Sequence, residues 1–558
     1  MDDLDDPLHR RALRVLRVAW SAGILGDVPI RSLPAALGVV REKGLNAAML
    51  HSLHARMHPA RLALVDAWRT VTWAQADEEI EQAARAMRSR LGLATGEAVA
   101  IALENRAEYV LGWFATMRAR VRVVHAGSHL TASELVHLVR TANVRAVLVS
   151  RGTQEMLREA RALLPDVELR VVHCGDGAPA EALTWAGLCA SGGPSQPLPL
   201  APAENVVFTS GTTGAPRGAA RDFGAFGATE LARVLERLPF TCGERHLVVA
   251  PVSHSAPQVF TLVHTALGST VQLLPHFEAA TTLRTLSTER ITSTFLVPTM
   301  LRRMLELSQE VHQATPTPEL RAVVLGSSEL GEDLRRGAIA RFGARTVFDF
   351  YGATELGWVT LIRGDEMLEH PGSVGRPLSG QRLRILDEQG RRCPPRVTGL
   401  VGVRNAQTML GYTGDEQATR ETVRGGWSTV EDLGWVDEAG YLYLAGRARD
   451  MVKSGGVNVY PAEVERVLQE DPQVREVAVI GVADRDWGER VVAVVVPRDG
   501  AFDAEEAKAR ARRTLSPAKV PREWHLVEHL PRNANGKVLK KELRARFGHG
   551  WNAPSHGG

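Results

Sequence analysis

The chain has 558 residues, with 67 basic and 64 acidic side chains and a formal net charge of +3. A balance this even gives no support for nucleic-acid binding, and 44% apolar with 23% charged residues is typical of a soluble globular protein. The length corresponds to about three to four average domains. No apolar run approaches the roughly 18 residues that a membrane-spanning helix needs, and the acidic start at residues 1–6 argues against a secretory signal.

The cysteines and lysines are both few. Cys174, Cys189, Cys242 and Cys393 lie far apart, without a CxxC pair or a Cys/His cluster, so we expect neither disulfides nor a zinc site, and the pattern fits a reducing cytoplasm. Arginine supplies nearly all the positive charge, because only seven basic residues are lysines: Lys43, Lys453, Lys508, Lys519, Lys537, Lys540 and Lys541. A lysine in this chain is therefore more informative than usual.

Residues 1–45 are expected to form a helical extension. Leu13, Leu16 and Trp20 share one helical face, and arginines stand between them. Packing on the protein's own domain is the interpretation we favour for this helix, and contact with a membrane surface is the alternative.

Residues 46–447 are predicted to form a large α/β domain. Between about residues 60 and 355, short apolar runs alternate with segments of helical spacing, such as 231–238 and 283–286. Strand–helix alternation of this kind indicates stacked, mostly parallel sheets flanked by helices. Strands are expected at residues 146–149, 206–208, 247–249, 271–274, 294–297, 322–325 and 347–350.

Residues 450–547 are predicted to form a small α+β domain, followed by a loose tail at 548–558. A helix is expected to open at Tyr460-Pro461, with proline in its first turn, and strands at 477–480 and 491–496.

The strongest local signal is the segment Thr209–Gly218, which follows an expected strand. Four hydroxyls and three glycines lie in it, with Arg217 near its end. Glycines let backbone N–H groups approach an anion closely, and hydroxyls and a cation add to its binding. A phosphate chain is the natural ligand, although the GxxxxGK[ST] pattern of a Walker loop is absent.

Four further segments are weaker when taken alone. Residues 349–355 end a predicted strand, where Tyr351 offers a flat face for a base and Glu355 a hard oxygen for Mg²⁺. In residues 426–450, Asp432 can hold two ribose hydroxyls and Arg447 can assist. Adjacent glycines in residues 453–463 allow close approach by a ligand, and residues 531–540 present Lys537 in a loop.

In this order, the five segments resemble the adenylate-forming superfamily of acyl-CoA synthetases, amino-acid adenylation domains and beetle luciferases. The resemblance extends from about residue 50 to 547. The sequences of residues 453–463 and 253–257 are most similar to those of bacterial fatty-acyl and related acyl-CoA synthetases. It implies a large N-terminal domain and a small mobile C-terminal domain that turns about a hinge near Arg449.

The resemblance also implies roles for individual residues. For ATP binding these are Thr209, Ser210, Gly211, Thr212, Thr213, Gly214, Arg217, Gly326, Ser327, Tyr351, Asp432 and Arg447. Thr354 would contact phosphate, Glu355 would hold Mg²⁺, and Lys537 would bridge the acid and the α-phosphate. Lys453 would approach the reacting centre in the second half-reaction, with Gly455 and Gly456 along the pantetheine of CoA. His254 would gate the acyl pocket.

Three positions depart from the family pattern. Arg217 replaces the usual lysine, and Arg449 stands where Asp or Lys is more common. The family's Thr-Gly-Asp is Val430-Glu431-Asp432, which loses a hydroxyl and adds a carboxylate near the ribose.

The implied activity is that of an ATP-dependent acyl-CoA synthetase that forms acyl-AMP and transfers the acyl group to CoA. Residues 252–260 lack the acidic residue that holds the ammonium group of amino acids in relatives, so a free amino acid is disfavoured. A medium- or long-chain fatty acid is the first choice and an aromatic or alicyclic acid the second. The alternatives are transfer to a carrier protein and a non-catalytic homologue that binds nucleotide or acyl groups.

Overall fold

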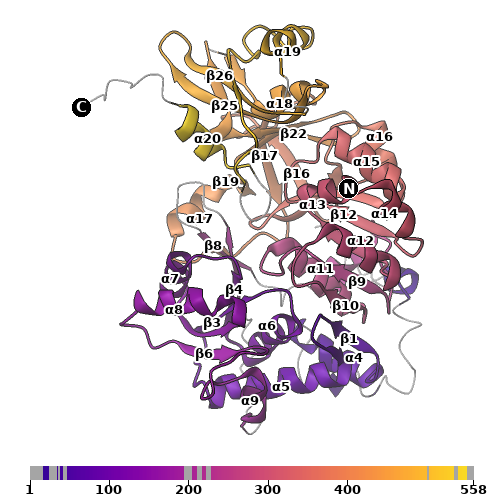
Figure 1. Ribbon diagram of the computed structural model, residues 1–558, viewed down its shortest axis with the longest axis vertical. Coiled ribbons are helices and arrows are strands. Elements are labelled where there is room, and N and C mark those ends of the chain that lie inside the picture. The colour runs from indigo at the N-terminus through magenta and orange to yellow at the C-terminus, as the bar shows by residue number, and fades with distance from the viewer. Residues whose placement is uncertain are drawn as a thin grey trace.

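The computed structural model describes residues 17–23, 34, 38–39, 41, 47–193, 204–209, 217–221, 228–455, 457–498, 502–532 and 538–548. A large N-terminal domain carries three sheets, and a small C-terminal domain carries a fourth (Figure 1). All seven strands expected in the large domain are present, as are the helix that opens at Pro461 and the two strands that follow it. The predicted α/β fold with a small second domain is confirmed.

The first sheet has the order β18-β8-β7-β4-β3-β5-β6 and is mostly parallel. Every residue of β3 is buried, because helices cover both faces of the sheet. Its strands are β3 (Ala98–Leu103), β4 (Arg122–Gly127), β5 (Val144–Val149), β6 (Arg170–His173), β7 (Asn205–Thr209), β8 (Arg217–Arg221) and β18 (Gly411–Tyr412).

The second sheet has the order β15-β14-β13-β12-β11-β9-β10-β1-β2, with a parallel centre and antiparallel edges. Its strands are β1 (Leu62–Val65), β2 (Thr70–Thr72), β9 (Arg245–Val248), β10 (Thr270–Leu273), β11 (Ser293–Leu296), β12 (Ala322–Leu325), β13 (Val347–Ala353), β14 (Gly357–Arg363) and β15 (Arg376–Pro377).

Helices separate these two sheets and cover their outer faces. The largest core cluster joins both sheets through α5 (Trp73–Ser89), the fully buried α6 (Ala107–Ala119) and α11 (Ser255–Ala266). On the outer face of the first sheet lie α7 (Ala132–Thr141) and α8 (Gln154–Ala162), and on that of the second lie α12 (Ala279–Thr288), α13 (Pro298–Leu305) and α15 (Glu332–Phe342). The other helices of this domain are α4 (Leu50–Met57), α9 (Trp185–Ala190), α10 (Ala228–Leu235), α14 (Gln309–Ala314), α16 (Gly364–Glu369) and α17 (Glu416–Thr422).

The third sheet is antiparallel, which the sequence did not lead us to expect. It packs on Tyr351 and Val359 of the second sheet. Its strands are β16 (Arg382–Leu386), β17 (Gly399–Arg404), β19 (Val423–Arg424), β20 (Trp427–Ser428), β21 (Asp432–Val436) and β22 (Leu442–Arg447).

The small domain follows a short 3-10 turn at Ala448–Asp450 and contacts β22 through α18 (Figure 1). It consists of β23 (Val452–Ser454), β24 (Val457–Val459), α18 (Pro461–Gln469), β25 (Val474–Asp484), β26 (Gly488–Pro497), α19 (Ala504–Ala511), β27 (Glu523–Leu526) and α20 (Lys540–Phe547). All the lysines except Lys43 follow Arg449 in the chain.

The described part of the N-terminal extension lies against the large domain. Val18 and Ala22 are buried, and the Cys242 amide donates to the Ala22 carbonyl over 2.9 Å. Trp20 is 77% exposed, and Leu13 and Leu16 lie outside the described residues. Within the described residues, no helix is long and apolar enough to cross a membrane.

Candidate active site

Tyr351, Asp432 and Arg447 come together at the junction of the second and third sheets. The Tyr351 hydroxyl donates to Asp432 Oδ2 over 2.8 Å, and Arg447 Nε lies 3.1 Å from Asp432 Oδ1. Asp432 and Arg447 face each other across the β21–β22 ladder, which fixes their spacing. Burial, and then Asp432, raise the pKa of Tyr351, so its hydroxyl remains a donor at neutral pH. The second and third sheets therefore bring together three of the residues predicted to bind the nucleotide.

Glu431 stands in a strained backbone conformation beside this cluster. Its φ is +64°, in the left-handed region that glycine adopts most readily. Its amide donates to Thr429 Oγ1 over 3.1 Å, and its carbonyl accepts from the Ala448 amide over 2.8 Å, so the turn is anchored on both sides. The side chain itself is exposed. The left-handed backbone conformation therefore explains why the family pattern has glycine at this position.

The variant Glu431→Gly is expected to stabilise the protein by roughly 0.5–1 kcal/mol, because relief of the left-handed strain exceeds the entropy cost of glycine. Thermal unfolding of the purified protein measures the change. Glu438→Gly is the matched control, because Glu438 is also exposed but lacks a positive φ, and it should not stabilise. A melting temperature lowered by Glu431→Gly would contradict the prediction.

The glycine- and hydroxyl-rich segment joins two paired strands of the first sheet. β7 ends at Thr209 and β8 begins at Arg217, and these residues are antiparallel partners. Ser210, Gly211, Thr212, Thr213 and Gly214 lie outside the described residues. Arg217 Nε lies 3.3 Å from Asp415 Oδ2, so its charge already has an acidic neighbour in this structure.

Thr354 and Glu355 follow β13, and Thr354 meets the start of α11. Thr354 Oγ1 lies 2.8 Å from Ser255 Oγ, and Glu355, 9% exposed, accepts a 2.9 Å hydrogen bond at Oε1 from the Tyr412 hydroxyl. His254 caps α11 one residue before Ser255. Burial, and then His129, lower the pKa of His254 to about 4, so its imidazole is neutral at physiological pH.

Gly326 and Ser327 leave β12 beside Phe350. A Cβ on Gly326 would lie 2.6 Å from the Phe350 ring, so only glycine fits there without a shift. Ser327 is exposed and has a φ of +72°. The chain therefore turns sharply at the edge where the base was predicted to bind.

The hairpin β23–β24 carries the residues predicted for the second half-reaction. Lys453 is exposed, with its amide bound to Glu489, and Arg449 is exposed in the 3-10 turn before the hairpin. Gly455 has a φ of +57°, and a Cβ on it would lie 2.6 Å from the Trp487 ring. Gly456 lies outside the described residues.

Trp487 and Arg522 were not identified from the sequence. The Arg522 guanidinium carbon lies 3.7 Å from the centroid of the Trp487 ring, and the Gly455 amide donates to the Trp487 carbonyl over 2.8 Å. Trp487 is 39% exposed, so an aromatic face and a cation border the glycine turn. Gly455, Trp487 and Arg522 are far apart in the sequence and meet only in the folded domain. The dipeptide Trp487-Gly488, which indicates a turn, was the only sign of this contact in the sequence.

Lys537 lies outside the described residues, but the base of its loop is described. Arg532 and Val538 form an antiparallel bridge that closes residues 533–537. Lys540 pairs with Glu465 over 2.6 Å and lies close enough to Glu329 of the large domain to interact electrostatically with its carboxyl. Desolvation and then Glu465 raise the pKa of Glu329 to about 7, against the opposing effect of Lys540 and two arginines. The loop base therefore lies near the Gly326–Leu330 turn.

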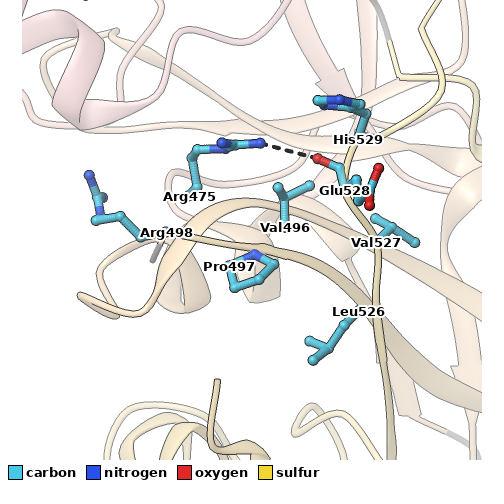
Figure 2. Close-up of a pocket in the computed structure, with 8 residues that line it drawn as sticks. All are labelled: Arg475, Val496, Pro497, Arg498, Leu526, Val527, Glu528 and His529. Atoms are coloured by element: carbon cyan, nitrogen blue, oxygen red, sulfur yellow. Dashed lines mark hydrogen bonds between the residues drawn. The ribbon is translucent and has the colours of Figure 1, made fainter. Parts of the chain in front are cut away.

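A separate hollow of about 550 Å³ lies on the small domain, where the parallel strands β26 and β27 end (Figure 2). Its lining residues are Arg475, Val496, Pro497, Arg498, Leu526, Val527, Glu528 and His529. Arg475 donates to the Glu528 carbonyl over 3.1 Å (Figure 2). Of the predicted site residues that the structure describes, none lines this hollow.

Two family models match the two domains. The model of the AMP-binding enzyme matches residues 52–413, and that of the AMP-binding enzyme C-terminal domain matches residues 463–537. The chain belongs to the AMP-binding enzyme family. The predicted membership of the adenylate-forming superfamily is therefore confirmed.

Curated relatives of this AMP-binding enzyme are named as CoA ligases, CoA synthases or an acyl-carrier-protein ligase. The chain is 30% identical to a 2-succinylbenzoate–CoA ligase of Bacillus licheniformis, covering 88% of this chain and 98% of the relative. It is 32% identical to a feruloyl-CoA synthase of an Amycolatopsis species, covering 91% and 100%. A relative from Streptomyces coeruleorubidus, 30% identical over 89% of this chain and 95% of its own length, is named a fatty acid–[acyl-carrier-protein] ligase.

A solved structure has the same architecture. An amide bond synthetase from Marinactinospora thermotolerans superposes with a TM-score of 0.79 at 28% identity, covering 92% of this chain and 100% of its own. The predicted class, an ATP-dependent AMP-forming ligase of the acyl-CoA synthetase type, is confirmed. The names of the first two relatives favour our second choice of acid, an aromatic one, over the fatty acid we placed first.

Proposed function

We propose that the protein is an aryl-CoA ligase, which activates an aromatic carboxylic acid with ATP and transfers it to CoA. The observation that carries the acid class is a cluster of four buried rings beside the site, formed by Phe260, Phe295, Phe350 and Trp358. The relatives named for succinylbenzoate and ferulate support the same class.

The ring cluster contacts one residue predicted to line the nucleotide site, because the Phe350 ring packs against Gly326. Ring centroids are 4.8 Å apart for Phe260–Trp358, 5.2 Å for Phe350–Trp358 and 5.3 Å for Phe260–Phe295. Phe260 lies on α11, the helix whose first residue, Ser255, meets Thr354. These rings are at most 7% exposed and fill the interior next to Gly326. A long alkyl chain would have to displace them, whereas a compact aromatic acid would need to contact only their edges.

In the first half-reaction, the acid carboxylate attacks the α-phosphorus of ATP, the bond to pyrophosphate breaks, and acyl-AMP forms. The carboxylate is ionised at neutral pH and needs no base. The chain therefore acts by positioning and charge stabilisation. Tyr351 and Asp432 would hold the nucleoside, residues 209–214 the phosphates, and Lys537 the negative charge between the acid and the α-phosphate.

Glu355 is suited to bind a Mg²⁺ ion that is also bound by the phosphates of the substrate. Among the described residues there is no group of three or more His, Cys, Asp or Glu that could hold a metal ion alone. The single nearly buried carboxylate of Glu355, one residue after the Thr354 hydroxyl that meets Ser255, is a hard-oxygen ligand of the kind that binds Mg²⁺ together with substrate phosphates. When bound, Mg²⁺ would neutralise phosphate charge.

In the second half-reaction, the thiol of CoA attacks the acyl carbon, the bond to AMP breaks, and the thiol proton passes to solvent. The small domain would turn about Arg449, remove Lys537 and bring Lys453, Gly455 and Gly456 to the site. Trp487 and Arg522 would border the acceptor path. Transfer to a carrier protein is the second candidate, which the Streptomyces coeruleorubidus relative supports.

Acid-dependent ATP/pyrophosphate exchange across a panel of acids tests the proposal. We expect exchange with a hydroxycinnamic or arylacetic acid to exceed that with octanoic or palmitic acid at least tenfold, roughly the discrimination a shaped pocket provides. Thioester assays with CoA and with a phosphopantetheinyl carrier protein then identify the acceptor. A preference for the fatty acids would overturn the aromatic assignment, and no exchange with any acid would favour the non-catalytic alternative.

Enlarging the ring cluster should change the preferred acid. Trp358→Ala is expected to raise the octanoate-to-aryl ratio of kcat/KM about tenfold, because it removes a wall of the cluster. Trp435→Ala, which removes a ring stacked on Tyr443 in the third sheet, is the control and should leave the ratio unchanged. An unchanged ratio in Trp358→Ala would exclude the cluster as the boundary of the acid site.

A further inference from the structure

We propose that Tyr412 is a positioning residue, which orients the Glu355 carboxylate for Mg²⁺ and is itself held beside the glycine-rich segment by Arg217 and Asp415. The inference rests on the proposed role of Glu355 in magnesium binding. Tyr412 belongs to none of the five segments from which the function was inferred.

The contact between Tyr412 and Glu355 is direct. The phenol hydroxyl donates to Glu355 Oε1 over 2.9 Å, and Glu355 is 9% exposed. Residues just before Tyr412 make a second hydrogen bond to Glu355. The Met409 amide donates to the Glu355 carbonyl over 2.9 Å. One short stretch of chain therefore fixes both the backbone and the carboxylate of Glu355.

Strand pairing explains how Tyr412 reaches this position. β18 pairs antiparallel with β8, so Tyr412 is opposite Ala219 and Gly411 is opposite Ala220. The Thr413 amide donates to the Gly218 carbonyl over 2.8 Å, and the Tyr412 amide donates to Thr419 Oγ1 over 2.8 Å. β8 begins where the glycine-rich segment ends. The first sheet thus places Tyr412 next to Gly218 and Ala219, at the described end of that segment, with its hydroxyl on Glu355.

Arg217 and Asp415 restrain the tyrosine from its other side. The Arg217 guanidinium carbon lies 5.7 Å from the centroid of the Tyr412 ring, within the range of a cation–π contact. Asp415 Oδ2 lies 3.3 Å from Arg217 Nε. Arg217, which we predicted to bind ATP directly, is here also the link between the phosphate segment and the tyrosine.

Orientation of a metal-binding carboxylate by a hydrogen-bonded neighbour increases metal affinity, and loss of such a neighbour commonly costs roughly 10- to 100-fold. The hydroxyl of Tyr412 restricts rotation of the carboxylate before the metal arrives. Its removal should weaken the response to Mg²⁺ while leaving the nucleoside contacts of Tyr351 and Asp432 intact.

The variant Tyr412→Phe tests the inference, because it deletes the hydroxyl and keeps the ring. In ATP/pyrophosphate exchange we expect the half-saturating Mg²⁺ concentration to rise at least tenfold, with a much smaller change in the rate at saturating Mg²⁺. A direct readout is Mn²⁺ binding to the full-length enzyme with a non-hydrolysable ATP analogue, followed by electron paramagnetic resonance. Tyr443→Phe is the matched control, because its hydroxyl also meets a carboxylate, Asp437, but in the third sheet.

A Glu355→Gln background separates this inference from the proposed function. If Glu355→Gln does not change the Mg²⁺ or Mn²⁺ response, the assignment of Glu355 itself fails. If Glu355→Gln changes it and Tyr412→Phe does not, the inference about Tyr412 alone is overturned. A tenfold effect of Tyr412→Phe that disappears in the Glu355→Gln background supports it, because coupled residues are not additive.

Discussion

Lys537→Ala is expected to slow acyl-adenylate formation by roughly 10²- to 10³-fold, the range seen when one positioned donor of charge stabilisation is removed. Thioester formation from supplied acyl-AMP should change far less, because Lys537 is proposed to act only in the first half-reaction. The bridge between Arg532 and Val538 and the pair of Lys540 with Glu465 fix the base of its loop on the small domain, and Lys540 also lies close enough to Glu329 of the large domain to interact with it electrostatically. ATP/pyrophosphate exchange measures the first step, and CoA acylation from the adenylate measures the second.

Lys541→Ala is the matched control for this prediction. Lys541 lies in the first turn of α20 and is exposed, so its removal should alter neither half-reaction. Equal losses in both assays for Lys537→Ala would contradict the assignment and would indicate a structural role for the loop.

Asp432→Ala is expected to raise the KM for ATP by roughly 30- to 100-fold, with little change in the KM for the acid. The carboxylate accepts from Tyr351 and pairs with Arg447, so its loss leaves both without their partner at the nucleoside side of the site. Truncating one member of a buried charge pair costs about 2–5 kcal/mol. We expect a cost at the lower end of this range for Asp432→Ala, because Arg447 is 28% exposed.

Steady-state kinetics with ATP and with the acid as the varied substrate check this result. Glu438→Ala provides the comparison, because Glu438 pairs with Arg396 where both side chains are more than 60% exposed, and such pairs contribute little. An unchanged KM for ATP in Asp432→Ala would exclude Asp432 from nucleotide binding.

Most of the large domain could be predicted from the sequence because its central strands are buried on both faces. Strands such as Ala322–Leu325 and Ser293–Leu296 are short apolar runs between helical segments. The third sheet was not anticipated, since strands such as Arg382–Leu386 combine half-buried, exposed and buried residues without a clear apolar run, and pair antiparallel. Its short strands β19 and β20 offer too few residues for a recognisable pattern.

Some residues of the candidate site could likewise be predicted from the sequence, and others could not. Tyr351, Asp432 and Arg447 were predicted through family segments, and the structure brings them into contact. Tyr412 and Trp487 could not be predicted, because each meets its partner through pairing of distant strands. Tyr412 reaches Glu355 only because β18 joins the edge of the first sheet, and Trp487 reaches Gly455 through the small-domain sheet.

The distribution of lysine offers a way to follow the two lobes separately. Six primary amines of side chains follow Arg449, and only Lys43 precedes it. A succinimidyl ester dye or an amine-directed cross-linker would therefore mark the smaller lobe almost alone, apart from Lys43 and the chain's own α-amine. A single round of acylation chemistry thus yields a reporter of how that lobe reorients during turnover, without engineered cysteines.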